Sequence, residues 1–176
     1  MDLHDFEIVA ENYDYYARTL VTEQAHAQKI DFHLELAGEY GGSGIVDIAC
    51  GTGDVAIPLA EAGQAVHAFD VSEAMISRFK VKIADADPSV QRKIDITLQN
   101  MVDFTYDRTF SLAMIPASGF MHLTTPEDQR KALSNINRHL EIGGVLTLNT
   151  FDPNMGRIAE NLDEATEYRK RTEFDR

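Results

Sequence analysis

The sequence predicts a doubly wound α/β domain with a mostly parallel sheet, and three observations lead to this fold class. Strand-sized apolar runs alternate with helix-like segments from residue 44 onward. A glycine turn, Gly51-Thr52-Gly53, follows the first apolar run directly. Polar residues follow the ends of the next runs, where parallel sheets bind ligands. We therefore expect an N-terminal helical cap over residues 1–43 and a ligand-binding domain over residues 44–176, together forming one structural unit.

The N-terminal part is predicted to be helical. Apolar side chains recur at helical spacing in residues 6–16 and again in residues 30–37. The run Gly41-Gly42-Ser43-Gly44 then interrupts this pattern and separates the cap from the sheet.

Five segments have the length and apolar content of β-strands. They are residues 45–49, 65–69, 94–98, 110–115 and 145–151. The first is apolar almost throughout, which is typical of a strand buried on both faces. In the third, Ile94, Ile96 and Leu98 alternate with polar residues, which indicates a strand at the edge of the sheet.

Helices are predicted between these strands. The first covers residues 54–62, and Ser72 can cap the second, whose inner face carries Met75, Ile76 and Phe79. Thr125 can cap the third, with Pro126 in its first turn and Gly143-Gly144 at its end. Its expected apolar stripe is Ala132, Leu133, Ile136 and Leu140. A last helix is expected over residues 154–165 and the start of a strand over residues 166–174.

Composition narrows the possible partners. The 176 residues are 44% hydrophobic, which suits one domain, and the apolar runs are too short to span a membrane. The 29 acidic against 16 basic residues give a net charge of −13, which disfavours a nucleic-acid substrate. Cys50 is the only cysteine, so no internal disulfide can form. We expect a cytoplasmic protein with a small-molecule substrate, no membrane partner and no metal ligands.

The charge around the glycine turn favours one class of cofactor over another. Residues 51–56 fit the dinucleotide pattern G-x-G-x-x-G/A, so an NAD-type oxidoreductase is one hypothesis. Asp47 and Asp54 flank the turn, however, and would repel a pyrophosphate. A cofactor that carries a sulfonium and an ammonium group would instead be attracted to Asp47. Asp54 is explained equally well as a residue favoured by a helix N-terminus.

The next strand ends carry further candidate ligands. Asp70 follows the second strand, where a carboxylate can accept both hydroxyls of a ribose. After the third strand, Asn100 or Asp103 could hydrogen-bond an adenine amino group, and Met101 could pack on the ring face.

Five motifs, taken in order, resemble the class I S-adenosylmethionine-dependent methyltransferase family. They are VDIACGTGD at 46–54, HAFDVSEAM at 67–75, LQNMVDF at 98–104, FSLAMIPASGFMHL at 110–123 and HLEIGGVLTLNTF at 139–151. The resemblance runs from about Asp5 to Phe151 and implies a Rossmann-like methyltransferase fold. It also implies S-adenosyl-L-methionine as cofactor, S-adenosyl-L-homocysteine as product, and methyl transfer to an unidentified small molecule.

The resemblance also implies the residues of the cofactor site. The first motif would hold the methionine portion, Asp70 the ribose, and Asn100 with Met101 the adenine. The implied cofactor-binding residues are Tyr16, Asp47, Ala49, Cys50, Gly51, Gly53, Asp70, Val71, Met75, Asn100, Met101 and Ile115. Two departures stand out. Ala49 occupies a position where many members have glycine, and Ile115-Pro116-Ala117-Ser118 replaces the Asn/Asp-Pro-Pro-aromatic loop of DNA-base methyltransferases.

Candidate catalytic residues lie in the loop after the fourth strand and in the cap. His122 could act as a general base for a hydroxyl or ammonium acceptor, and Tyr13 could face the same site. Packing roles are the alternative for both. Cys50 is expected to pack in the turn and not to act as a nucleophile.

The expected C-terminal strands appear incomplete by comparison with the family, so the fifth strand would keep an unpaired edge. Either the chain is a fragment, or a second copy covers that edge in a homodimer. A non-catalytic S-adenosylmethionine-binding module is therefore a further hypothesis.

Overall fold

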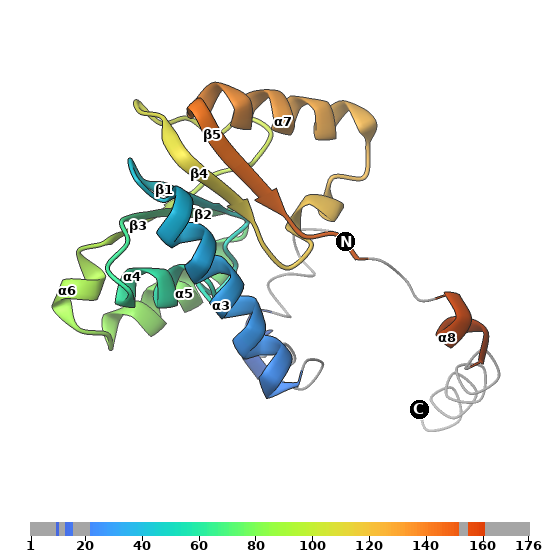
Figure 1. The fold of residues 1–176 in the computed structure, drawn as a ribbon, viewed down its shortest axis with the longest axis horizontal. Helices are drawn as coiled ribbons and strands as arrows, with labels where there is room; N and C mark the ends of the chain where they lie inside the picture. Colours follow the sequence, from blue (N-terminus) through green and yellow to red (C-terminus); the bar gives the residue numbers. More distant parts are fainter. Residues whose placement is uncertain (1–9, 11–12, 16–21, 152–154, 161–176) are drawn as a thin grey trace.

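The computed structural model describes residues 10, 13–15, 22–151 and 155–160. Five strands form one sheet in the order β3-β2-β1-β4-β5, and every neighbouring pair is parallel (Figure 1). The strands are β1 (Ile45–Ile48), β2 (Val66–Asp70), β3 (Ile94–Leu98), β4 (Phe110–Ile115) and β5 (Leu140–Leu148). The helices are α3 (Glu23–Tyr40), α4 (Ala56–Glu61), α5 (Glu73–Ala84), α6 (Pro88–Gln91), the 3₁₀-helix η1 (Gly119–His122), α7 (Pro126–His139) and α8 (Met155–Glu160). The predicted doubly wound α/β fold class is confirmed.

The order of the strands reverses beside β1. From β1 the chain adds β2 and β3 on one side, and then returns to add β4 and β5 on the other. A reversal of this kind opens a crevice at the carboxyl ends of the central strands. The topology therefore points to the carboxyl ends of β1 and β4 as the expected place for a ligand site.

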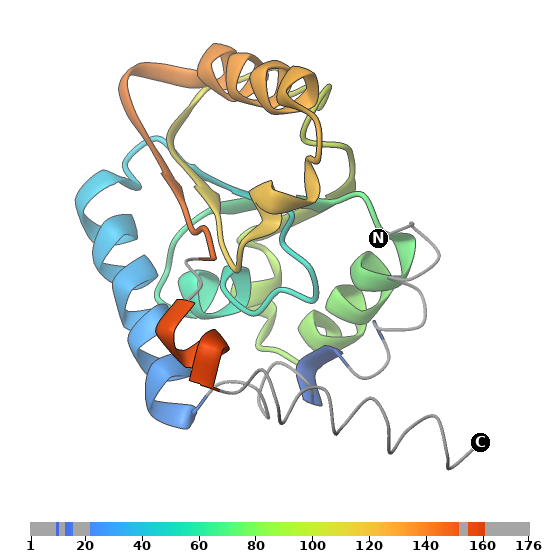
Figure 2. The ribbon, with the colours of Figure 1, turned by 90° about the vertical axis from the view of Figure 1, so that its right-hand side faces the viewer.

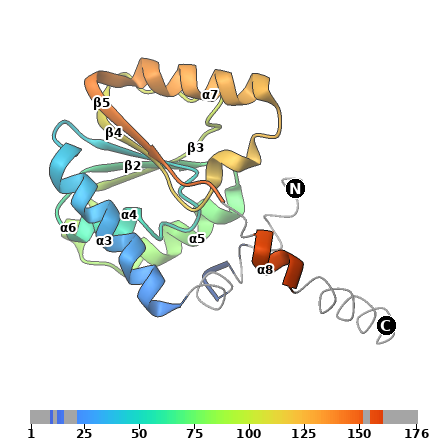
Figure 3. The same cartoon turned by 45° about the vertical axis from the view of Figure 1, so that its right-hand side comes forward.

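Helices cover both faces of the sheet. Helices α3, α4 and α5 lie on one face, and α7 lies on the other (Figure 2 and Figure 3). In β1, Ile45 packs in the cluster of α3, α4 and α5, while Val46 and Ile48 pack with Ile136 of α7. Because successive side chains of a strand alternate between faces, Asp47 points to the same face as Ile45.

The end of α7 differs from the prediction. Gly143-Gly144 were expected to end this helix, but α7 ends at His139 and β5 begins with the next residue. The two glycines lie inside β5, whose pairing with β4 shifts register between Phe110 and Leu112. Gly143 has a φ of 84°, a conformation that favours glycine. The pair therefore accommodates an irregular strand and does not stop a helix.

Two residues were assigned wrongly to the apolar stripe of α7. Leu133 is 40% exposed, and Leu140 belongs to β5 and not to α7. The edge strand predicted over residues 94–98 is confirmed as β3, and its last residue, Leu98, is 47% exposed. Leu133 follows the buried Ala132, and one residue along a helix turns the side chain about 100° away from the core.

The predicted helix caps are confirmed. The side chain of Ser72 accepts a hydrogen bond from the Met75 amide, and that of Thr125 accepts one from the Asp128 amide. The helix expected from residue 54 begins two residues later, at Ala56.

The C-terminal predictions are only partly covered by the structure. Of the helix expected over residues 154–165, α8 is the described part, and the strand expected over residues 166–174 lies outside the described residues. Within the described chain, β5 pairs with β4 and with no other strand. None of the described helices is both long and apolar enough to cross a membrane. The division into a cap and a domain at residue 43 stays a prediction.

Candidate active site

The glycine turn after β1 is a sharply bent segment. With the two residues that lead into it, the turn covers residues 49–53, and Ala49, Gly51 and Gly53 have left-handed φ values of 56°, 55° and 83°. The amide of Cys50 donates to the Phe69 carbonyl at 3.0 Å, which ties the turn to the end of β2. The turn therefore presents its backbone at the carboxyl ends of β1 and β2.

The two glycines of this turn have different physical roles. A Cβ at Gly53 would lie 2.3 Å from the Phe79 ring, so the packing of α5 requires glycine there. At Gly51 a Cβ would meet only the Tyr13 ring, at 3.8 Å. The backbone of Gly51 is thus the part of the turn that a ligand can approach.

Asp70 joins the end of β2 to the glycine turn. One of its oxygens accepts a hydrogen bond from the Gly51 amide and the other accepts one from the Ser72 amide, both at 2.9 Å. Each carboxylate oxygen can accept a further hydrogen bond. Asp70 therefore fixes the turn and keeps acceptor capacity toward the crevice.

Asp47 is a buried carboxyl group near the carboxyl end of β1. Its side chain is 0% exposed, and neither oxygen has a hydrogen-bond partner among the described residues. Burial raises the pKa of Asp47 to about 8, with further contributions from Asp70 and Asp54. Since buried polar groups are almost always paired, this carboxyl group calls for a cationic or hydrogen-bonding ligand.

The segment 13–15 lies against the glycine turn. Burial raises the pKa of Tyr13, and the carboxylates of Asp54 and Asp70 raise it further, so its hydroxyl stays protonated at neutral pH. Asp14 accepts a hydrogen bond from the Thr52 hydroxyl at 2.6 Å and contacts the Lys82 ammonium at 3.1 Å. Tyr16, also predicted to bind the cofactor, lies outside the described residues.

Asp54 is explained by an ion pair with α3. Its carboxylate pairs with the Lys29 ammonium, and His26 lies 3.6 Å from its other oxygen. It therefore joins α3 to the glycine turn. The sequence suggested either a role beside the cofactor or a favourable position at a helix N-terminus for Asp54, and it did not predict the pairing with Lys29.

The end of β3 is held by a local turn. The Asn100 side chain accepts a hydrogen bond from the Val102 amide at 3.0 Å, and Asn100 is exposed. Met101 is only 9% exposed and packs in the cluster that contains Phe69 and Phe104. Their predicted contacts with adenine stay predictions.

The loop after β4 rests on the glycine turn. Ile115 is buried, and the next turn, Pro116–Gly119, is closed by a 3.1 Å hydrogen bond between its end residues. Ala117 and Ser118 have φ values of 50° and 62°, so both are left-handed. A Cβ at Gly119 would lie 3.0 Å from the Cβ of Ala49. This loop leads into η1, which carries the exposed His122.

The remaining predicted cofactor-binding residues differ in exposure: Cys50 and Met75 are buried, whereas Val71 is exposed. Cys50 is buried, and burial together with Asp47 raises the pKa of its thiol, which fits a packing role and not a nucleophile. Val71 is 42% exposed beside Asp70, whereas Met75 is 3% exposed under the Ser72 cap. The structure thus gathers most of the predicted residues at the carboxyl ends of β1, β2 and β4, but their contacts with a ligand stay predictions.

Asp14, Thr52 and Lys82 were not predicted from the sequence as site residues. A threonine inside a glycine turn could have signalled a buried hydroxyl that needs a partner. Its partners, however, come from positions 14 and 82, and no local pattern links such distant positions.

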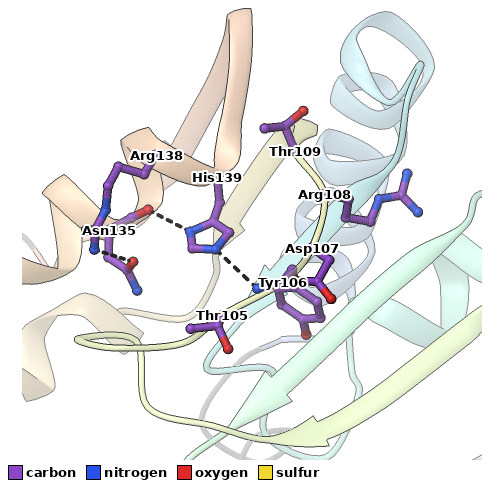
Figure 4. Close-up of a pocket in the computed structure, with 8 residues that line it drawn as sticks. All are labelled: Thr105, Tyr106, Asp107, Arg108, Thr109, Asn135, Arg138 and His139. Carbon is purple, nitrogen blue, oxygen red and sulfur yellow. Dashed lines mark hydrogen bonds between the residues drawn. The ribbon is translucent and has the colours of Figure 1, made fainter.

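A cavity lies at the opposite end of the sheet. It has a volume of about 630 Å³ and is lined by residues 105–109 before β4 and by Asn135, Arg138 and His139 at the end of α7 (Figure 4). Its two guanidinium groups, Arg108 and Arg138, point away from each other in Figure 4. No convergent set of donors is formed, so we do not assign a ligand to this cavity.

Comparisons with known proteins agree with this geometry. A family described as a methyltransferase domain matches residues 45–144. The chain is 29% identical over 147 residues to a cypemycin N-terminal methyltransferase of a Streptomyces species, covering 84% of this chain and 56% of that protein. It is 32% identical over 124 residues to the putative methyltransferase YqeM of Bacillus subtilis, covering 69% of this chain and 47% of that protein.

The fold agrees with solved structures as well. The CcbJ methyltransferase from Streptomyces caelestis superposes with a TM-score of 0.67 at 22% identity, covering 80% of this chain and 54% of that one. The glycopeptide N-methyltransferase MtfA, crystallised with S-adenosyl-L-methionine, superposes with a TM-score of 0.62 at 24% identity, covering 68% of this chain and 48% of that one. The chain spans about half the length of the relatives it matches. Its sequence motifs, fold and family match together show that it belongs to the methyltransferase domain family.

Proposed function

We propose that this chain provides the cofactor site of an S-adenosyl-L-methionine-dependent methyltransferase that acts on a small molecule. The single observation that carries the proposal is Asp47, a fully buried carboxyl group beside a glycine turn that has no hydrogen-bond partner in the described part of the chain. A ligand with an ammonium and a sulfonium group supplies the positive charge that this site lacks. A pyrophosphate would add negative charge next to Asp47, Asp54 and Asp70, so NAD fits poorly.

The residues present fit this cofactor. Asp47 and the backbone of Gly51 would hold the methionine portion, and Asp70 would accept the ribose hydroxyls while it keeps its bond to the Gly51 amide. When bound, the cofactor supplies an activated methyl group on a sulfonium, which is already a strong electrophile. The chain therefore has to orient the two reactants and exclude water.

The acceptor side is proposed to be the loop after β4. This loop lies against Ala49 of the glycine turn and carries His122 on η1. His122 is the proposed general base for an acceptor that must lose a proton, and Tyr13, held protonated, is proposed as a hydrogen-bond donor. The net charge of −13 supports a small acceptor over a nucleic acid.

We make two further proposals, one about the cellular compartment and one about the open edge of β5. The lone buried thiol of Cys50 suits a reducing, cytoplasmic compartment. We also propose that the outer edge of β5 is covered, either by a second copy of the chain or by further residues of a longer protein, because open strand edges invite pairing.

Calorimetry can test the cofactor. We would titrate the protein with S-adenosyl-L-methionine, S-adenosyl-L-homocysteine and NAD, and repeat the titrations with Asp70→Asn and with the exposed control Asp85→Ala. We expect the first two ligands to bind, Asp70→Asn to weaken them at least about tenfold, and Asp85→Ala to leave them unchanged. Binding of NAD alone would reject the proposal.

A further inference from the structure

We propose that Asp14, Thr52 and Lys82 form an anchor that fixes segment 13–15 on the glycine turn and thereby positions Tyr13 at the cofactor site. The part of this inference that concerns the cofactor rests on the proposed function. We call these three residues the Asp14 anchor. Asp14 and Lys82 lie outside the five motifs that carry the family resemblance. Thr52 lies in the first motif, but the motif assigns no role to its hydroxyl.

Three distant parts of the chain meet in the anchor. Thr52 is 0% exposed, and its hydroxyl donates to Asp14 Oδ1 at 2.6 Å. Lys82 Nζ, from the last turn of α5, lies 3.1 Å from the same Asp14 oxygen and 3.3 Å from Thr52 Oγ1. The three polar groups therefore contact one another in a closed triangle.

The chemistry of the three groups makes Asp14 necessary. An ammonium can only donate hydrogen bonds, so Lys82 cannot accept the Thr52 proton. Without Asp14, the buried Thr52 hydroxyl would lose its acceptor, and an unpaired buried donor is costly. The ion pair itself adds less, because both of its side chains are nearly 30% exposed, at 29% and 27%.

The charges around Asp14 keep it ionised. Burial acts to raise the pKa of Asp14, but the Thr52 hydrogen bond and the Lys82 charge outweigh it and lower the pKa. Arg78, one turn earlier on α5, adds a second positive charge that acts in the same direction. The Asp14 carboxylate is therefore ionised at neutral pH, and its protonation in acid would weaken the anchor.

The anchor has a direct consequence for Tyr13, the neighbour of Asp14. The Tyr13 ring lies 3.8 Å from the position that a Cβ on Gly51 would occupy. That distance places the ring over the part of the turn that a ligand can approach. Asp14, Thr52 and Lys82 are thus positioning residues, and they act on the cofactor through Tyr13.

Two measurements test the anchor, one without the cofactor and one with it. The first is amide hydrogen exchange of residues 13–15 in the cofactor-free protein. The second is the dissociation rate of S-adenosyl-L-homocysteine by stopped flow. The variants are Thr52→Val, which keeps the side-chain shape, and Lys82→Met, with Lys82→Arg as the conservative rescue. Lys80→Met is the matched control, because Lys80 is an exposed lysine on the same helix.

We expect Thr52→Val to raise both rates roughly fivefold, which corresponds to the loss of one net hydrogen bond. Lys82→Met should raise both by a smaller factor, Lys82→Arg should restore them, and Lys80→Met should leave them unchanged. Unchanged exchange in a folded Thr52→Val protein would overturn the anchor. Faster exchange with an unchanged dissociation rate would overturn its role in positioning Tyr13. If the unmutated protein binds no S-adenosyl-L-homocysteine, the proposed function fails, whereas the exchange measurement still decides whether the anchor exists.

Discussion

The two ends of the sheet treat their polar groups in opposite ways. At the amino ends, the Arg108 guanidinium donates to the Ser43 carbonyl and to His67 Nε2. The other ring nitrogen of His67 lies 3.1 Å from the Asp95 carboxylate. At the carboxyl ends, Asp47 is buried with no partner among the described residues. The amino ends pair their charged groups within the chain, whereas the carboxyl ends keep a buried carboxyl group that is unpaired within the described residues.

Backbone strain follows the same division. Among the described residues, the non-glycine residues with positive φ are Ala49, Ala117 and Ser118. All three follow the carboxyl ends of β1 or β4. A strained backbone and an unpaired buried carboxyl group persist only where the rest of the fold is stable enough to hold them. The amino ends therefore contribute to stability, while the carboxyl ends cost stability, which agrees with the ligand site that we propose there.

The largest expected effect is the loss of stability when the glycine turn at the carboxyl end of β1 is changed. Gly53→Ala would place a Cβ 2.3 Å from the Phe79 ring, at a φ of 83°. We expect it to lower the free energy of unfolding by about 3 kcal/mol or more, measured by urea unfolding. Gly42→Ala is the control, because nothing lies within 4 Å of its Cβ position. Equal stabilities of the two variants would contradict the packing role of Gly53.

The next effect concerns pH and Asp47. Its pKa rises from an ordinary 3.8 to about 8 in the fold, so the folded state holds a proton that the unfolded state has lost between these values. The free energy of unfolding of the cofactor-free protein should therefore fall as pH rises from about 4 to about 8, on the order of a few kcal/mol.

Asp47→Asn should remove most of this slope, as measured by urea unfolding at several pH values. Asp95→Asn is the matched control, because the Asp95 side chain is 56% exposed. A slope that persists in Asp47→Asn would mean that another group carries the proton.

A smaller effect is expected at the amino ends. Arg108→Met removes the bonds to Ser43 and His67 and the contact with the Phe110 ring at 5.4 Å. We expect a loss of about 1 to 2 kcal/mol in the free energy of unfolding, with cofactor affinity unchanged. A comparable loss of cofactor affinity in Arg108→Met would contradict the claim that the amino ends contribute to stability and not to binding.

The smallest effect has the opposite sign. Ala49→Gly relieves a left-handed alanine and should raise the free energy of unfolding by about 1 kcal/mol. Gly119→Ala should destabilise the chain, because its Cβ would lie 3.0 Å from that of Ala49. The same substitution should cost less in an Ala49→Gly background. Additive effects in this double-mutant cycle would show that the two positions do not contact each other.

Elements with a strong local signal could be predicted from the sequence. The apolar run of β4 gave its bounds correctly, and Ser72 and Thr125 marked their helix starts because a capping residue acts within its own turn. Gly143-Gly144 led to a wrong prediction of the end of α7, because glycine suits both a helix end and an irregular strand. Only the pairing with β4 decides between the two.

In the candidate site, too, features with a local sequence signal could be predicted, and contacts between distant residues could not. Asp47 lies near the carboxyl end of β1, Asp70 ends β2, and the glycines follow β1. Their gathering in space therefore follows from a parallel sheet alone. The Asp14 anchor and the pairing of Lys29 with Asp54 join residues far apart in the sequence. Such contacts depend on how helices pack, which a local pattern does not encode.

The most direct test of the central claim is a titration of the protein and its Asp47→Asn variant with S-adenosyl-L-methionine at pH 6 and pH 7, where the ammonium group of the ligand stays protonated. Because a cationic ligand favours the ionised carboxylate, we expect the unmutated protein to bind more tightly at the higher pH. Asp47→Asn should bind at least about tenfold more weakly and without this pH dependence. Equal affinity of the two proteins at both pH values would contradict the account.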